Sequence, residues 1–213
     1  MEKGDLVLID YVGYQDGEIF DLSNEERAKE EGLYNENMEF GPVPVLIGEG
    51  YVIEGLEEAL EDMEVGDEKE LEIPSDKAYG KRSSDNIETY PEKEFKKQDV
   101  NARPGDRIMI GNRQGRILSR SSGRVKVDFN HPLSGKDLEY DVEVLEKVED
   151  DEEKARKIFD YRLGHGEIEF DGDKVIIDHD IEDHDHELPE NVKEEIRTEI
   201  LENTGFEEVE IKG

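Results

Sequence analysis

The chain has 213 residues, with 60 acidic and 27 basic side chains, a formal net charge of −33 and no cysteine. This length permits one large domain or two to three small ones, and the absence of thiols excludes disulfides and cysteine chemistry. The longest apolar stretches, near Leu6 and Val43, are far too short to cross a bilayer. The first residues show no signal-peptide pattern, so we expect a soluble, cytoplasmic protein.

The acidic excess has two interpretations that the sequence leaves open. Low hydrophobicity with high net charge is a signature of disorder, but Val7, Ile9 and Tyr11 alternate with polar neighbours, as in a half-buried strand. One interpretation is adaptation to high internal salt, because at molar salt the Debye length falls to about 3 Å and self-repulsion is screened. The other is a merely acidic, soluble protein.

The first predicted unit is discontinuous and covers residues 1–83 and 131–150. Its strands are expected to centre on Val7, Val45, Leu71 and Val142. One short amphipathic helix is expected from Leu56 to Met63, because apolar residues recur there at helical spacing. A polar segment between them is predicted to hold a second short helix over residues 25–31, capped by Ser23 and stopped by Gly32.

The second predicted unit, residues 84–130, interrupts the first. Three apolar-alternating runs near residues 107–110, 115–118 and 124–129 predict a small antiparallel meander with turns at Gly111-Asn112 and Ser121-Ser122-Gly123. Between Asn101 and Lys126 there are seven basic residues and a single acid, Asp106. That segment is therefore +6, and the rest of the chain is −39.

The third predicted unit, residues 151–213, follows the acidic link 149–153. A helix ending at Gly164, a hairpin turning at Asp171-Gly172-Asp173, a helix opened by Pro189 and a last strand near residues 206–211 give the order α-β-β-α-β.

Several motifs, in this order, resemble the FKBP family of peptidyl-prolyl isomerases. They are Tyr11-Val12-Gly13, Asp16-Gly17-Glu18-Ile19-Phe20-Asp21, the run from Gly48 to Glu57, Val65-Gly66-Asp67-Glu68 and Ala78-Tyr79-Gly80. The run Asn130-His131-Pro132-Leu133-Ser134-Gly135-Lys136 is typical of the SlyD-like branch, which carries a chaperone domain inserted in the flap. The resemblance implies an α+β fold: an antiparallel half-barrel around a short helix, a small all-β insert, and the extra C-terminal domain of longer archaeal-type members.

By resemblance, nine residues form the catalytic pocket, and no cofactor is needed. They are Tyr11, Phe20, Asp21, Val43, Val52, Ile53, Leu56, Tyr79 and Tyr140. Leu56 would form the floor under the proline ring, between Phe20 and Tyr140 as walls. The Ile53 N–H and the Tyr79 hydroxyl would hold substrate carbonyls, and Asp21 would bond the Tyr11 hydroxyl. The floor is tryptophan in many members, so Leu56 predicts weaker binding of macrolide ligands.

The insert is predicted to bind client chains through apolar side chains ringed by Arg and Lys, which would attract acidic unfolded polypeptides. The candidates are Ile108, Ile110, Ile117, Val125, Val127 and Phe129. A solvated strand face is an equal alternative. Nucleic-acid binding ranks below both, because a charge of −39 elsewhere repels phosphate.

A histidine-rich acidic run, residues 178–187, contains His179, His184 and His186, and imidazole with carboxylate can bind nickel, copper or zinc. A solvated acidic loop is the favoured interpretation, so no metal is expected. We expect a prolyl isomerase with chaperone activity on unfolded or nascent polypeptides, with no membrane partner and a possible homodimer through residues 151–213. The alternatives are a holdase chaperone with a vestigial pocket and a metal-binding protein using the histidines.

Overall fold

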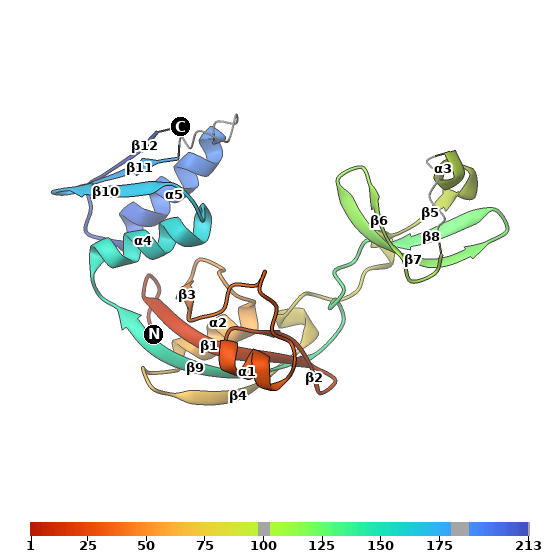
Figure 1. Ribbon diagram of the computed structural model, residues 1–213, viewed down its shortest axis with the longest axis horizontal. Coiled ribbons are helices and arrows are strands. Elements are labelled where there is room, and N and C mark those ends of the chain that lie inside the picture. The colour runs from red at the N-terminus through yellow and green to blue at the C-terminus, as the bar shows by residue number, and fades with distance from the viewer. Residues whose placement is uncertain (98–102, 180–187, 213) are drawn as a thin grey trace. The chain divides into compact units, whose positions relative to one another are not determined.

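The computed structural model describes residues 1–97, 103–179 and 188–212. The chain divides into two compact units (Figure 1). The first joins Met1–Ile73 to Leu138–Gly213, and the second is Pro74–Asp137. The predicted insert, residues 84–130, lies inside the second unit. Residues 151–213, predicted as a C-terminal domain, belong to the first unit.

A five-stranded antiparallel sheet forms the centre of the first unit. One edge of β1 pairs with β9, and β4 pairs with the other edge of β9. The second edge of β1 pairs with β3 in its first half and with β2 in its second half. The strands are β1 (Leu6–Gln15), β2 (Glu18–Leu22), β3 (Val43–Leu46), β4 (Glu68–Ile73) and β9 (Leu138–Val148). Leu138, Tyr140, Val142 and Val144 of β9 are buried, and the residues between them are more exposed. This alternation places one face of the sheet in the core.

Two helices belong to this sheet, α1 (Glu25–Glu30) and α2 (Glu54–Glu61). α2 contacts β4 and buries Leu56 and Leu60. The prediction that Ser23 caps α1 was wrong, because Asn24 is the cap and its side chain accepts from the Arg27 N–H at 3.0 Å. Ser23 is instead buried, and its hydroxyl accepts from the Tyr11 N–H at 2.8 Å.

The C-terminal part of the first unit has the predicted order α-β-β-α-β. Its elements are α4 (Asp151–Arg162), β10 (Glu167–Asp171), β11 (Lys174–Asp178), α5 (Glu190–Asn203) and β12 (Glu208–Lys212). β10 and β11 form an antiparallel hairpin, and β12 pairs with β11 in parallel. Both helices bury apolar side chains, among them Ile158 and Ile200, and β11 buries Val175 and Ile177. The hairpin turns at Gly172, whose φ of +60° favours glycine.

The second unit is a four-stranded antiparallel sheet in the order β5-β8-β7-β6. It contains β5 (Ile87–Pro91), α3 (Glu92–Lys97), β6 (Arg107–Ile110), β7 (Arg113–Ser121) and β8 (Arg124–Asp128), with short 3-10 helices at Ser75–Lys77 and Ser84–Asn86. The three predicted strands are present. β5 was missed because its terminal Pro91 suggests a break, although proline is tolerated on an edge strand.

Candidate active site

Three aromatic rings of the first unit form a cluster at one end of the sheet. Tyr140 of β9 lies 5.9 Å from Tyr11 and 5.8 Å from Phe20, measured between ring centroids, and its ring is nearly perpendicular to that of Phe20. Tyr11 and Phe20 are half-buried, and Tyr140 is buried. The structure therefore brings together three of the predicted pocket residues from three strands.

A bulge and a glycine allow these rings to meet. The β1–β2 register pairs Gly13 with Asp21 and Tyr14 with Ile19, which leaves Phe20 as the extra residue. A bulge of this kind redirects a side chain. A Cβ on Gly13 would lie 2.8 Å from the Phe20 ring and 3.1 Å from the Tyr140 ring. Gly13 is thus needed for the cluster, a role that sequence reasoning missed although the glycine stands in the Tyr11-Val12-Gly13 motif.

Asp21 lies beside the same cluster and is held in place by hydrogen bonds. The Tyr11 hydroxyl donates to Asp21 Oδ2 at 2.8 Å, which confirms the expected pairing. The other carboxylate oxygen, Oδ1, accepts from the Leu22 N–H at 3.0 Å. The carboxylate therefore has a fixed orientation at the edge of an aromatic surface.

The other predicted pocket residues of this unit lie in β3, in α2 and in the segment between them. Leu56 is 2% exposed, while Val43, Val52 and Ile53 are half-buried. Ile53 is the N-cap of α2, and its carbonyl accepts from the Leu56 N–H at 2.9 Å. Among the described residues the Ile53 N–H makes no hydrogen bond, as suits its predicted role as a donor to substrate.

Tyr79 belongs to the second unit, which is described by itself, so its part in the pocket stays a prediction. Its ring stacks on His131 with centroids 4.0 Å apart, and its carbonyl accepts from the Ser134 hydroxyl at 3.0 Å. His131 Nδ1 accepts from the Leu133 N–H at 3.2 Å. Stacking covers one face of the imidazole, and this partial burial lowers the His131 pKa. The motif of residues 130–136 thus builds the surroundings of Tyr79.

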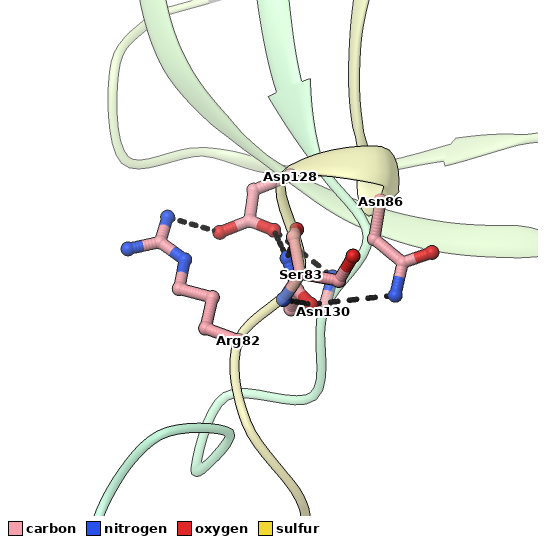
Figure 2. Close-up of polar contacts among 5 residues, drawn as sticks. All are labelled: Arg82, Ser83, Asn86, Asp128 and Asn130. Atoms are coloured by element: carbon pink, nitrogen blue, oxygen red, sulfur yellow. Dashed lines mark hydrogen bonds and ion pairs between the residues drawn. The ribbon is translucent and has the colours of Figure 1, made fainter.

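Two chain segments enter the small sheet of the second unit, and Asn130 joins them (Figure 2). Its side-chain amide accepts from the Ser83 N–H and donates to the Ser83 carbonyl, both at 2.9 Å. Asn86 donates to the same amide oxygen at 3.3 Å, and Asp128 accepts from Asn130 and pairs with Arg82. One asparagine therefore satisfies backbone groups on the opposite segment, as a strand pairing would.

The six predicted client-binding residues pack into or against the core of the second unit. Ile117, Val125 and Val127 are buried together with Phe95 of α3, and Ile108, Ile110 and Phe129 are half-buried against them. In this conformation these side chains do not form the exposed apolar surface that the sequence analysis expected. The reason is that strand alternation places them all on the face covered by α3.

The opposite face of that sheet is basic. Arg107, Arg116, Arg124 and Lys126 are exposed, and none makes an ion pair with another described residue. Arg107 and Arg116 are direct cross-strand partners, an arrangement that is unfavourable for like charges. Met109, two residues after Arg107 on the edge strand β6, is 61% exposed. We call these five residues the basic face.

A hollow on the first unit shares only Tyr11 with the predicted pocket. In addition to Tyr11, charged side chains of β1, β4, β9 and α1 form most of its lining, for example Asp10, Arg27 and Glu70. The apolar side chains in its lining are limited to Tyr11, Val12 and Val142, so a proline ring would lie mostly among charged groups, and we do not assign the hollow to the site.

The histidine-rich run lies mostly outside the described residues. His179 is buried, and its ring lies 4.4 Å from that of His165, whereas His184 and His186 lie outside the described residues. Within the described ranges, no group of three or more His, Asp or Glu is placed to hold a metal ion. No helix in the described part of the chain is long and apolar enough to cross a membrane.

Comparison with known proteins identifies the family. A family model described as "FKBP26, IF domain" matches residues 89–133. The "Short-type peptidyl-prolyl cis-trans isomerase" of Methanocaldococcus jannaschii is 38% identical over 144 residues, which are 68% of this chain and 92% of that protein. The "FKBP-type peptidyl-prolyl cis-trans isomerase SlyD" of Escherichia coli is 30% identical over 154 residues, 70% of this chain and 74% of that protein.

A crystal structure of a peptidyl-prolyl cis-trans isomerase from Pseudomonas syringae aligns with 70% of this chain and 65% of its own, at a TM-score of 0.35 and 20% identity. The sequence relatives decide the assignment: the chain belongs to the FKBP family of peptidyl-prolyl cis-trans isomerases. It is an isomerase of the SlyD-like kind, as the motifs predicted.

Proposed function

We propose that this isomerase accelerates X-Pro isomerisation in unfolded or partly folded polypeptides, and that its insert captures those chains. The observation that supports the pocket is the cluster of Tyr11, Phe20 and Tyr140 beside a carboxylate, Asp21, that Tyr11 orients. Four polar or aromatic groups from three strands converge there on one apolar surface.

The chemistry requires neither a nucleophile nor a metal. Rotation about a peptide bond has a barrier of about 18–20 kcal/mol because resonance keeps the amide planar. Before proline, cis and trans differ little in energy, so slow exchange is the only obstacle. A twisted amide has lost resonance and is less dipolar. An apolar pocket therefore stabilises it relative to the planar amide, which is differential binding of the transition state.

Five pocket residues of the first unit have distinct roles in this proposal. The buried Leu56 forms the floor, and Phe20 and Tyr140 form walls that keep water from the proline ring. The Ile53 N–H, at the start of α2, holds a substrate carbonyl. Asp21 supplies a fixed negative field near the rotating bond, since two hydrogen bonds fix its position.

For client capture we propose the basic face rather than the apolar side of the insert. The second unit has fourteen Lys and Arg against nine Asp and Glu, a net charge of +5, whereas the first unit has 13 against 51, a net charge of −38. Four cations without an ion pair to a described residue lie on this one face, and the exposed Met109 lies two residues along β6 from Arg107. Such a face suits an acidic, partly apolar segment. Aromatic rings that would stack on bases are missing from the described basic face, because Tyr90 and Phe129 pack on the core side.

The experiment for capture is charge reversal. Arg107, Arg116 and Arg124 are changed to Glu together, and binding of a reduced, unfolded acidic protein is measured in low and in molar KCl. We expect affinity to fall about tenfold or more at low salt and the difference to shrink in molar KCl. The matched control changes Lys3, Lys29 and Lys69 of the first unit to Glu, with the same net charge. Equal losses in both variants, or tighter binding of single-stranded RNA than of the protein client, would contradict the proposal.

The experiment for the enzyme is the rate of proline-limited refolding of a model protein, at low and molar KCl. It compares the intact chain, a chain lacking residues 84–130, and the Tyr79→Ala, Asp21→Ala double variant. We expect catalysis by the intact chain, little by the double variant, and a reduced rate without the insert because tethered capture raises the local substrate concentration. Suppressed aggregation without any acceleration would favour the holdase alternative.

A further inference from the structure

The C-terminal helices contact the loop that carries two predicted pocket residues. Tyr161, in the last turn of α4, stacks on Tyr51 with ring centroids 3.9 Å apart and planes within 13°. Its hydroxyl donates to the Tyr51 carbonyl oxygen at 3.3 Å. Because Tyr51 directly precedes Val52 and Ile53, α4 holds the chain where the proposed pocket begins.

Arg162 adds a second contact to the same ring. Its Nε and Nη2 donate to the two carboxylate oxygens of Glu199 at 2.6 and 3.0 Å. Glu199, on α5, is only 5% exposed. A bidentate pair of this kind fixes the plane of the guanidinium, which lies 5.3 Å from the centre of the Tyr51 ring, within the range of a cation–π contact. Both C-terminal helices therefore take part in holding Tyr51.

Tyr51 is buried beside these two side chains. Its side chain is 9% exposed, and its hydroxyl makes no hydrogen bond of normal geometry with a described residue. Burial, with a smaller contribution from the nearby Glu199 carboxylate, raises the pKa of this phenol far above its usual value. The Tyr51 phenol therefore stays neutral, and its ring is free to stack on Tyr161 and to face the Arg162 guanidinium.

The rest of the loop is held on its other side. Glu57 of α2 accepts from the N–H groups of Gly48 and Gly50 at 2.9 and 3.3 Å. Both glycines have positive φ, +91° and +68°, so this stretch has the backbone freedom of glycine. Tyr51 is the next residue, and its side chain is the one buried side chain between Gly48 and Val52. The position of the Ile53 N–H therefore depends on Tyr51 before it and on α2 after it.

We infer that Tyr161 and Arg162 are positioning residues for the isomerase pocket, acting as a clamp on Tyr51. The inference rests on the proposed pocket and gives the C-terminal helices a part in catalysis. The clamp fixes Val52 and the Ile53 donor before substrate arrives, so that substrate binding does not have to order them. Pre-positioning of this kind raises the rate because the geometry needed in the transition state already exists.

The test uses the full chain and a short proline-containing peptide, whose isomerisation does not require client capture. Tyr161→Ala should lower kcat/KM about tenfold, because small displacements of a binding group have effects of that size or larger. Tyr161→Phe keeps the stacked ring and should stay within about twofold of the unchanged chain, since only a long hydrogen bond is lost. Asp160→Ala, at an exposed neighbour on α4, is the matched control and should have no effect.

Two further readouts separate positioning from general destabilisation. Thermal unfolding shows whether Tyr161→Ala is fully folded at the assay temperature, and amide NMR should show Val52 and Ile53 shifted or broadened while β9 is unchanged. A loss of activity that only follows the unfolded fraction would overturn the inference. So would kcat/KM within about twofold of the unchanged chain in Tyr161→Ala.

Asp21→Ala in the same assay separates this inference from the proposed pocket. If Asp21→Ala loses activity and Tyr161→Ala does not, the pocket stands and the clamp is wrong. If Asp21→Ala is fully active, the pocket assignment fails, and the clamp on it fails as well.

Discussion

The two units build their cores in the same way and expose opposite surfaces. In each unit, an antiparallel sheet buries aliphatic side chains against a short helix. In the first unit this helix is α2, which contributes Leu56, and in the second it is α3, which contributes Phe95. The first unit is strongly acidic and leaves aromatic rings half-buried at one end of its sheet. The second is basic and turns arginines to solvent. Strand alternation decides which face is buried, and the residues on the remaining surface decide what each unit does.

The largest expected difference between the two units comes from truncating Leu56, the proposed floor of the pocket in the first unit. Leu56→Ala should destabilise that unit by about 3 kcal/mol, because a fully buried leucine leaves a cavity, and it should also lower isomerase activity. Urea unfolding followed by NMR should show the second unit unaffected. Val65→Ala, at a residue that is 53% exposed, should change neither property. Equal destabilisation of both units would contradict their independence.

The corresponding change in the second unit is Asn130→Ala. It leaves the Ser83 N–H and carbonyl without their partner, so we expect this unit to lose about 2 kcal/mol. Hydrogen exchange in β5 and β8 should become faster, while exchange in β1 and β9 stays the same. Asn112→Ala, in the exposed turn between β6 and β7, is the control and should be silent.

The pocket itself is examined with two matched tyrosines on β1. Tyr11→Phe removes the 2.8 Å hydrogen bond that orients Asp21, and Tyr14→Phe removes a 2.9 Å bond to Asp141. We expect kcat/KM to fall about tenfold in the first, equivalent to ~1.4 kcal/mol of transition-state stabilisation, and to change little in the second. Equal effects would show that the aromatic cluster has no special role in catalysis.

The smallest expected effect is a pH dependence at His131. Its folded-state pKa lies below the ordinary value of 6.5, so the unfolded chain takes up a proton first as pH falls. The second unit should therefore keep its full stability above about pH 6.5 and lose a little of it as pH falls through the lowered pKa. Melting at pH 7.5 and pH 5 measures the change, and His131→Asn should reduce it. An increase in stability at low pH would contradict this sign.

Local patterns in the sequence predicted much of the fold. The alternation in β1 and β9, the helical spacing of Leu56 and Leu60, and the glycine at the 171–173 turn act over a few residues, so they can be recognised without the fold. The motif order indicated the family, and the relatives confirm it. The pairing of Tyr11 with Asp21, ten residues apart across a predicted strand pair, was also within reach.

Only the tertiary structure decided which surfaces remain free and which distant groups meet. Tyr51 and Tyr161 are separated by 110 positions, and no local pattern indicates that their rings stack. The same holds for Gly13, whose missing side chain matters because Phe20 and Tyr140 come from other strands. The sequence pattern predicted that the apolar residues of the insert are available to clients, whereas in the structure they pack in a core that includes Phe95 of α3. Periodicity specifies a face, whereas the partner of that face depends on contacts between segments far apart in the chain.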